Sequence, residues 1–331
     1  MSFMLPHSPS AQAEVHELAD FAELLCWEQG SSSAREIVAA LGRLDDNDNN
    51  VGADDNEART TDYLDDVMNE ISRRAASCDA AYPFSLGLKG ASLHYQNATE
   101  ADPKSTVYRY LLLSTRLNMK DDRMHDGLDG SLLLEELSAH VLRNYLGSNR
   151  AKSLVFGTAI GGNFQKRVEA MCRDLGEGER FRNLDGVPPS ARDDALDAVA
   201  WIPFTDGLPG QLIVFAQCKT GSSWGDHLLD LQPDNFIRKW MEPGILVRPM
   251  RAFCVAEAAD RALWNSTCVE AGILLDRCRL VDFSDNVEAE LLKRIARWTK
   301  AARASVTVAT PKPRKAPRPR GKGVRHARRT S

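Results

Sequence analysis

The sequence predicts a mixed α/β protein, and three features of the chain carry this prediction. Apolar residues recur at helical spacing in several segments, most strongly in residues 131–147. The run "GQLIVFAQCKTG" at residues 210–221 is rich in Ile, Val and Phe, which is typical of a buried strand. Predicted helices and strands follow one another along residues 131–302, and such an order indicates a mixed α/β plan.

Size and composition indicate a cytoplasmic protein with two domains. The chain has 331 residues, 43% of them hydrophobic and 27% charged, which is enough to bury a sizeable core. It contains no apolar run long enough for a membrane span, and its first residues lack the basic and apolar regions of a signal peptide. The seven cysteines form no CxxC pair, so we expect reduced, buried thiols.

The N-terminal region, residues 1–127, is predicted to be mainly helical. Residues 11–43 predict two helices separated by "EQGSSS", with Ser33 as the N-cap of the second. The following segments are an acidic linker at 44–61, a helix at 62–76, a strand-like segment at 82–96, a buried helix at 105–119 and a polar linker at 121–130.

The acidic linker partly matches a calcium-binding loop. The residues at ligand positions are Asp46, Asp48, Asn50, Asp54 and Glu57. Val51 occupies the position where such a loop needs glycine, and a β-branched residue resists positive φ. A solvated linker is therefore the favoured interpretation.

The helix predicted at 131–147 has a carboxylate on the edge of its apolar face. At 100° per residue one face collects Leu134, Leu137, Val141 and Tyr145. Glu136 points away from that face, whereas Glu135 flanks it, so Glu135 is expected to lean towards the interior.

The rest of the chain predicts strands flanked by helices, followed by a basic tail. The expected segments are a helix at 161–178, strands at 193–204, 210–221 and 251–258, a helix-to-strand passage at 264–283 and a last helix at 287–302. Residues 311–331 carry nine Lys or Arg and no acid, so against a net charge of −4 for the whole chain the remainder carries −13. Such a tail is expected to be disordered and to contact a polyanion through phosphates, and the alternative is a solubilising or nonspecific tail with no defined role.

Three polar residues are predicted to meet at the ends of two neighbouring strands. A strand's period of two places Gln217 and Lys219 on the same face. Asp197 stands at the start of the preceding strand, and a turn around "TDGLPG" would return the chain antiparallel, bringing Asp197 close to both. A carboxylate and an amide oxygen suit Mg²⁺, and a lysine beside them suits a phosphate or an attacking water. The group therefore indicates metal-assisted phosphodiester hydrolysis.

The segments "SLLLEEL", "DDALDAVAW" and "FAQCKTG" resemble the motifs of the PD-(D/E)xK nuclease superfamily, which has the restriction-endonuclease-like fold. The resemblance covers about residues 128–285 and implies a mixed central sheet flanked by helices. It places Glu135 as the helix acid and Asp197 as the metal-binding aspartate. It places Gln217 at the usual Glu or Asp position and Lys219 as the catalytic lysine.

The chain departs from the family pattern at two positions. Gln217 replaces an acid, as in the Mrr-like restriction endonucleases, and should weaken metal binding because one negative charge is lost. Leu196 replaces the proline that conventionally precedes the aspartate, which many members of the superfamily also lack.

The resemblance implies a cytoplasmic, Mg²⁺- or Mn²⁺-dependent DNA endonuclease acting in defence against foreign DNA. Its catalytic residues would be Lys219, Asp197, Gln217 and Glu135, the last three also holding the metal. The expected domains are a helical region at 1–127, a nuclease domain at 128–309 and a basic tail at 310–331. The sequence leaves open a homodimer and a partner protein of a defence system at the N-terminal region.

Two rival interpretations remain. The pattern can be accidental, with Asp197 as a strand-entry residue and Lys219 as a lysine at the sheet edge. The chain can also be a catalytically weak or inactive nucleic-acid-binding module that keeps the fold, because Gln217 weakens the metal site. A peptidase or other hydrolase lacks support, since the chain has neither a nucleophile elbow nor a zinc motif.

Further residues are minor candidates for the site, and a structural role is favoured for most of them. Asp193 and Asp194 would be solvated turn residues, His227 a surface residue, and Cys218 would point away from Lys219, which disfavours a Cys-His hydrolase. Ser222, Ser223 and Trp224 would lie near DNA, although Trp224 more often packs. Asp276 and Arg277 predict a structural ion pair.

Overall fold

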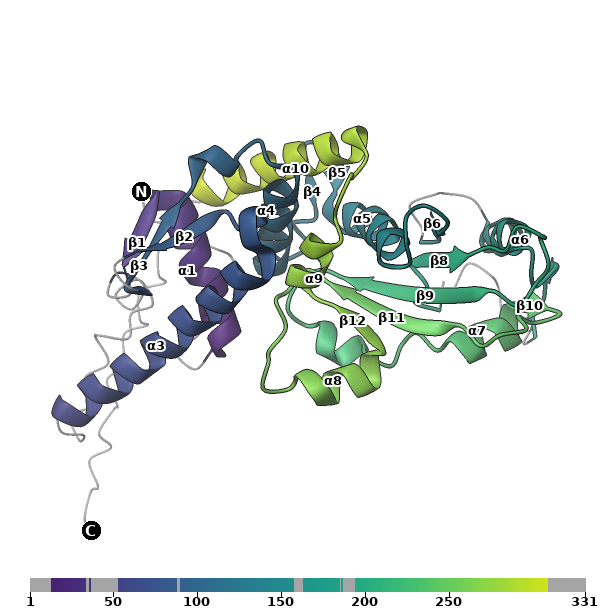
Figure 1. The fold of residues 1–331 in the computed structure, drawn as a ribbon, viewed down its shortest axis with the longest axis horizontal. Helices are drawn as coiled ribbons and strands as arrows, with labels where there is room; N and C mark the ends of the chain where they lie inside the picture. The colour runs from purple at the N-terminus through teal and green to yellow at the C-terminus, as the bar shows by residue number, and fades with distance from the viewer. Residues whose placement is uncertain are drawn as a thin grey trace, which may run out of the picture.

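A helical N-terminal part and a five-stranded mixed sheet with helices on its faces make up the fold (Figure 1). The computed structural model describes residues 13–33, 36, 53–87, 90–157, 163–184, 186 and 194–308. These elements confirm the predicted mixed α/β class. Among the helices in those ranges, none is both long and apolar enough to cross a membrane.

In the described residues of the N-terminal part, three helices accompany a small antiparallel sheet. The helices are α1 (Val15–Gln29), α3 (Ala53–Cys78) and α4 (Pro103–Arg116), and the 3₁₀ turns are η1 (Asp79–Ala81) and η3 (Asn97–Thr99). The strands are β1 (Ser31–Ser33), β2 (Phe84–Gly87) and β3 (Ser92–Tyr95), in the order β1-β3-β2. The strand-like pattern at 82–96 and the helix at 105–119 are thus confirmed.

The acidic segment is more helical than predicted. α3 begins at Ala53, inside the segment 44–61 that was expected to be a linker. Acidic residues are favourable in the first turn of a helix, so an acidic composition did not by itself indicate a loop. Of the calcium-loop pattern, residues 46–51 lie outside the described part of the chain, as does most of the second helix predicted within 11–43. Ser33 does form a capping box with Glu36, in which each side chain accepts from the other residue's N–H.

A tight hairpin takes the place of the polar linker predicted at 121–130. It joins β4 (Met124–His125) to β5 (Leu128–Asp129) through Asp126 and Gly127, whose φ angles are 51° and 71°. An Asp-Gly pair is the usual signal for a two-residue turn of this hand. Asp129 then caps α5 (Gly130–Tyr145), because its carboxylate accepts from the Ser131 N–H at 2.9 Å.

The central sheet has both antiparallel and parallel strands. Its strands are β6 (Lys152–Val155), β8 (Ala198–Ile202), β9 (Leu212–Lys219), β11 (Met250–Val255) and β12 (Ile273–Leu275), in the order β12-β11-β9-β8-β6. β8 runs antiparallel to its two neighbours, β6 and β9, whereas β9, β11 and β12 run parallel to one another. The predicted antiparallel return is confirmed by the pairing of Ala198 with Ala216. β6 was not predicted.

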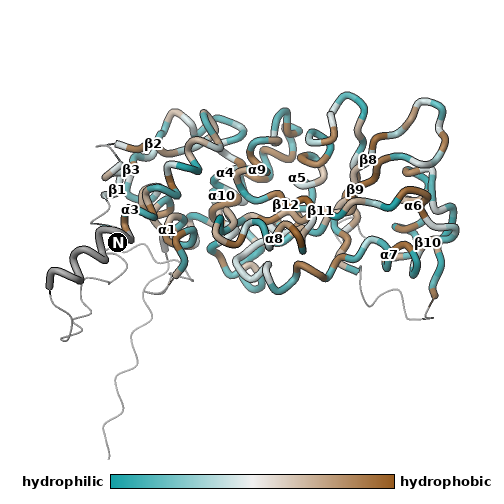
Figure 2. Tube along the Cα trace, turned by 60° about the horizontal axis from the view of Figure 1, so that its bottom comes forward, coloured by the Kyte–Doolittle hydropathy of each residue, from teal (hydrophilic) through white to brown (hydrophobic). Residues whose placement is uncertain are grey.

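Helices and one small strand pair surround this sheet. They are α6 (Phe164–Leu175), α7 (Pro233–Trp240), α8 (Trp264–Ala271), α9 (Arg277–Asp282), α10 (Ala289–Val308), η5 (Trp224–His227), and β7 (Arg180–Phe181) paired with β10 (Met241–Glu242). α9 was not expected within the helix-to-strand passage at 264–283. Figure 2 shows apolar residues along β8 and β9, between the helices that cover them.

Successive side chains of a strand point to opposite faces of the sheet, so the two faces pack against different helices. Ala198, Ala216 and Cys218 belong to a core that also contains α1, α4, α5 and α10. Phe215 and Trp201 point to the other face and pack with residues of α6 and α7. The first core runs without a break from the N-terminal part into the sheet. The domain boundary at 127/128 stays a prediction, and the apolar packing continues across it.

A buried ionic network also joins the two parts. Asp20 in α1 accepts hydrogen bonds from Arg277 at 2.7 and 2.9 Å, from Arg74 at 2.6 Å and from Arg116 at 2.8 Å. Burial alone would raise the pKa of Asp20, but the three guanidinium groups hold it well below its usual value. Arg116 also donates to Glu257 at 2.7 Å, so the network reaches the segment that follows β11.

The predicted ion pair between Asp276 and Arg277 is wrong, because each residue has another partner. Arg277 pairs with Asp20, while Asp276 caps α9 and accepts from Arg261 at 2.8 Å. Adjacent residues at a helix start point in different directions, which explains the separate partners. Both residues are structural, as expected.

Candidate active site

The candidate active site lies at one edge of the central sheet, where β6 and β9 end and β8 begins. Because β8 is antiparallel to both neighbours, the start of β8 lies beside the ends of the other two strands. The structure therefore brings the sequence-predicted residues of β8 and β9 to one place.

Asp197 is fixed between the two neighbouring strands. Its carboxylate accepts a hydrogen bond from the Cys218 N–H at 2.7 Å, between Gln217 and Lys219 in the chain. Its own N–H donates to Ala216 O at 2.9 Å, and its carbonyl accepts from the Phe156 N–H at 2.7 Å. The half-buried carboxylate is thus held beside the QxK segment, as the sequence predicted.

Gln217 is a fully buried amide whose polar atoms have no hydrogen-bond partner in the part of the chain that the structure describes. Its exposed fraction is 0%, and neither Oε1 nor Nε2 has a hydrogen-bond partner among the described residues. A buried amide without hydrogen bonds costs about 1–3 kcal/mol. The Gln217 side chain therefore has the free oxygen that a metal or water ligand requires.

Lys219 ends β9 on the same face as Gln217. It is half-buried, and its backbone carbonyl accepts from the Ala256 N–H at 3.2 Å, beside the end of β11. Within the described part of the chain its ammonium makes no ion pair and no side-chain hydrogen bond. The backbone of Lys219 is therefore fixed in the sheet, while its ammonium remains available to a ligand.

Glu135 reaches this edge of the sheet from α5. A Cβ atom added to Gly157 would lie 2.8 Å from Glu135 Cδ, so the carboxylate occupies the space that the glycine leaves. The Gly157 N–H donates to Asp197 O at 3.1 Å, which puts Glu135 next to Asp197. Glu136, by contrast, pairs with Arg294 of α10. The inward lean of Glu135 and the outward direction of Glu136 are both as predicted.

Arg167 on α6 is a cation at this site that the sequence prediction missed. Its Nη1 donates to Phe156 O at 2.8 Å, and its guanidinium carbon lies 5.3 Å from the Phe156 ring centre and 5.6 Å from that of Phe164. It pairs with no carboxylate among the described residues, and its buried Nε has no acceptor there. Arg167 stands three residues after Phe164 and one before Val168, at the edge of the apolar face of α6, and this spacing was the available signal.

The minor candidates have structural contacts. Asp194 accepts from Trp240 Nε1 at 2.6 Å, and His227 is partly exposed and paired with Asp230. Trp224 packs against Phe253 and donates to Glu257, so it does not face a ligand. Asp193 lies outside the described residues, and Ser222 and Ser223 are exposed.

Cys218 faces the opposite side of the sheet, in the core that contains α5. Burial raises the pKa of this thiol well above its usual value, and the neighbouring Cys254 and Asp197 raise it further. A thiolate nucleophile is therefore disfavoured, in agreement with the sequence.

The side chains at this sheet edge offer oxygen donors of the kind a divalent metal uses, although the donor set is weak. Among the described residues no group of three or more His, Cys, Asp or Glu could hold a metal ion. The candidate set instead contains two carboxylates, Glu135 and Asp197, with the unpartnered oxygen of Gln217. Oxygen donors of this kind suit Mg²⁺, which keeps several waters and needs only one or two protein carboxylates.

The comparisons with known proteins leave the family of this chain unassigned. No protein-family model, no curated protein and no solved structure matches it. The geometry of the sheet edge is therefore what any functional proposal must rest on.

Proposed function

We propose that the protein is a metal-dependent nuclease that hydrolyses phosphodiester bonds in DNA. The observation that carries the proposal is the clamped position of Asp197, whose carboxylate is bound to the backbone between Gln217 and Lys219. The mixed sheet, with a helix acid at the same edge, supports a restriction-endonuclease-like core. The resemblance to Mrr-like enzymes further suggests a role in defence against foreign DNA.

Each side chain of the site would have a role that follows from its charge and its donor or acceptor atoms. Glu135, Asp197 and Gln217 would hold the metal, which supplies an acidified water and charge stabilisation when it is bound. Lys219 would hold the scissile phosphate or orient the attacking water, because its ammonium has no other partner among the described residues. Arg167 would bind a neighbouring phosphate oxygen through the guanidinium edge that the two phenylalanines leave free.

DNA is the proposed substrate because the site and the tail favour a polyanion. Lys219 and Arg167 present positive charge at the sheet edge, and residues 311–331 add nine cations. The acidic remainder of the chain would otherwise repel a nucleic acid. Binding through the tail would be independent of sequence and sensitive to salt.

Plasmid cleavage in Mg²⁺ or Mn²⁺ tests the proposal with matched variants. Asp197→Asn keeps an oxygen for the Cys218 N–H but removes the charge, and Lys219→Ala removes the ammonium. Each should lower the cleavage rate by about 100-fold or more. Lys152→Ala is the matched control, because Lys152 is an exposed lysine at the opposite end of β6 and should leave the rate unchanged. Equal cleavage by wild type and both site variants would refute the assignment.

The second candidate function is a nucleic-acid-binding module that does not cut. Gln217 favours it, since an amide in place of an acid removes one charge from the metal site. This function predicts that wild-type protein retards DNA on a gel but cleaves neither DNA nor RNA with either metal. Gel retardation without cleavage would therefore select the module over the nuclease.

A further inference from the structure

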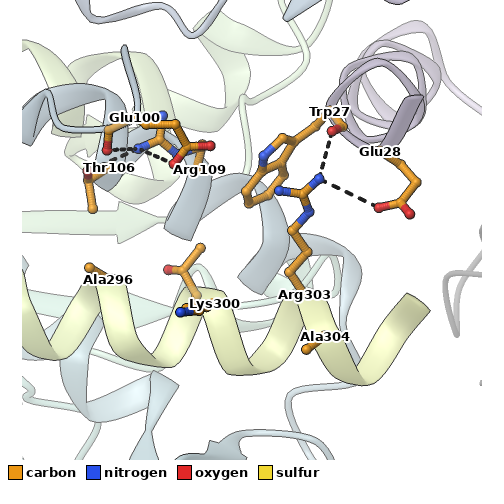
Figure 3. A pocket seen from close by; sticks show the side chains of 10 residues that line it. Trp27, Glu28, Glu100, Thr106, Arg109, Ala296, Lys300, Arg303 and Ala304 are labelled. Atoms are coloured by element: carbon orange, nitrogen blue, oxygen red, sulfur yellow. Dashed lines mark hydrogen bonds and ion pairs between the residues drawn. The ribbon is translucent and has the colours of Figure 1, made fainter. Parts of the chain in front are cut away.

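A cavity of about 730 Å³ lies between α1, α4 and α10 and shares no residue with the candidate active site (Figure 3). It is lined by Trp27 and Glu28 at the end of α1, by Arg109 of α4 and by one face of α10. Cavities of about 300–1,000 Å³ are typical of small-molecule sites. The cavity is therefore large enough for an organic ligand.

The face of α10 that lines the cavity combines small residues with cations. The lining residues on α10 are Ala296, Thr299, Lys300, Arg303 and Ala304. Their spacing of three or four residues puts them on one side of the helix. Two alanines leave room between the helices, while Lys300 and Arg303 bring positive charge to that space.

Trp27 contributes a buried donor that lacks an acceptor. Its side chain is 6% exposed, and its Nε1 has no hydrogen-bond partner among the described residues. The indole N–H can only donate, so it needs an oxygen or another acceptor to avoid an unsatisfied buried group. Arg303 lies over the ring, 4.6 Å from its centre, and donates to Trp27 O at 2.8 Å, which fixes the indole in the cavity wall.

The charges around the cavity favour an anion. Arg109, Lys300 and Arg303 face two carboxylates, Glu28 and Glu100. Arg109 donates to the backbone carbonyls of Thr99 and Glu100, and Arg303 lies 3.7 Å from Glu28. The exposed Lys300 forms no ion pair with any described residue. The ammonium of Lys300 thus faces the cavity without a carboxylate partner among the described residues, and the Trp27 side chain forms part of the wall beside it.

We propose that this cavity binds a small organic anion, whose phosphate or carboxylate group contacts Lys300 while the rest of the ligand packs beside Trp27. The carboxylates of Glu28 and Glu100 would accept from hydroxyl or amino groups elsewhere on the ligand. This site does not depend on the proposed nuclease activity, because its lining residues are separate. Its place between the N-terminal helices and the last helix suits a ligand that stabilises their packing.

Calorimetric titration of the full chain with AMP, citrate and inorganic phosphate tests the site. AMP or citrate should bind, and Lys300→Gln should weaken that binding by about tenfold or more. Lys293→Gln is the matched control, because Lys293 lies on the exposed side of the same helix beside Glu290. Failure of all three probes to bind at 10 mM, binding of inorganic phosphate alone, or equal weakening by both variants would overturn the proposal.

Nuclear magnetic resonance supplies a second readout at the indole itself. The chain has six tryptophans, so a ¹⁵N-labelled sample gives six indole N–H signals, and Trp27→Phe identifies the relevant one. A saturating ligand should shift that signal, because Trp27 forms part of the cavity wall. An unmoved signal at saturation would overturn the role of Trp27. The Lys300→Gln titration remains decisive if Trp27→Phe does not fold.

Discussion

Replacing Gly157 by alanine should disable the candidate active site while leaving the fold intact. The added Cβ would lie 2.8 Å from Glu135 Cδ, whereas carbon atoms in contact prefer about 3.5 Å or more. Because Glu135 Oε2 lies closer still to the added Cβ, the carboxylate must retreat by at least about 0.7 Å. The clashing atoms belong to the end of a flexible side chain, so the free energy of unfolding should change by less than about 1 kcal/mol.

A shift of this size matters for catalysis even though it hardly affects stability. A misplacement of about 1 Å in a catalytic group can cost about 100-fold in rate. We expect Gly157→Ala to lower plasmid cleavage by about that factor, with an unchanged midpoint of urea unfolding. Gly225→Ala is the control, because a Cβ at Gly225 meets no atom within 4 Å and its φ is not positive.

A double mutant tests whether Gly157→Ala lowers cleavage by displacing the Glu135 carboxylate. If Gly157→Ala acts by displacing the carboxylate, it should cause no further loss of cleavage in a Glu135→Ala background. A full additional 100-fold loss in that background would show that Gly157 acts through another group. Wild-type activity in the single Gly157→Ala variant would refute the placement of Glu135 at this site.

Three further predictions concern the metal site, the buried network and the tail. Gln217→Glu should tighten Mn²⁺ binding in calorimetry by about tenfold because it adds a charge to the donor set, and unchanged or weaker binding would argue against a metal at this residue. Asp20→Asn should lower the free energy of unfolding by about 3–5 kcal/mol, since three guanidinium groups lose their common partner; a loss below about 1 kcal/mol in urea unfolding would contradict this. The depressed pKa of Asp20 means that its stabilisation is present above its ordinary pKa of 3.8 and is lost as the pH falls through its lower folded pKa, so the Asn variant should lack this part of the acid dependence. Deleting residues 311–331 should weaken DNA binding and flatten its dependence on salt, and a salt slope equal to that of the full chain would refute a phosphate-binding tail.

The strands that carry the site could be predicted from the sequence because the signals for each strand lie within its own residues. Apolar alternation and the turn around "TDGLPG" are local signals, and they were enough to bring Asp197 beside Gln217 and Lys219. The same holds for Glu135, whose position at the edge of the apolar face follows from its spacing in the sequence from Leu134 and Leu137.

The missed features depend on contacts between distant segments. β6 is a four-residue edge strand without a fully buried residue, so its periodicity was too short to recognise. Without β6, neither Phe156 nor the carbonyl that holds Arg167 could be placed. The bond from Arg277 to Asp20 joins residues 257 positions apart, and no local pattern encodes such a pair.

Contacts between the N-terminal part and the sheet suggest why the two cannot be treated as separate modules. The Gly221 N–H, two residues after Lys219, donates to Ser114 O of α4 at 3.2 Å. Trp224, in the same loop, donates to Glu257, which also accepts from Arg116 of α4. The loop that follows the candidate lysine is thus anchored to an N-terminal helix at two points. A truncation at 127/128 would remove Ser114 and Arg116 from these contacts and Asp20 from Arg277, so its inactivity would say nothing about the chemistry of Lys219. Point substitutions in the full chain are therefore the informative test of the site.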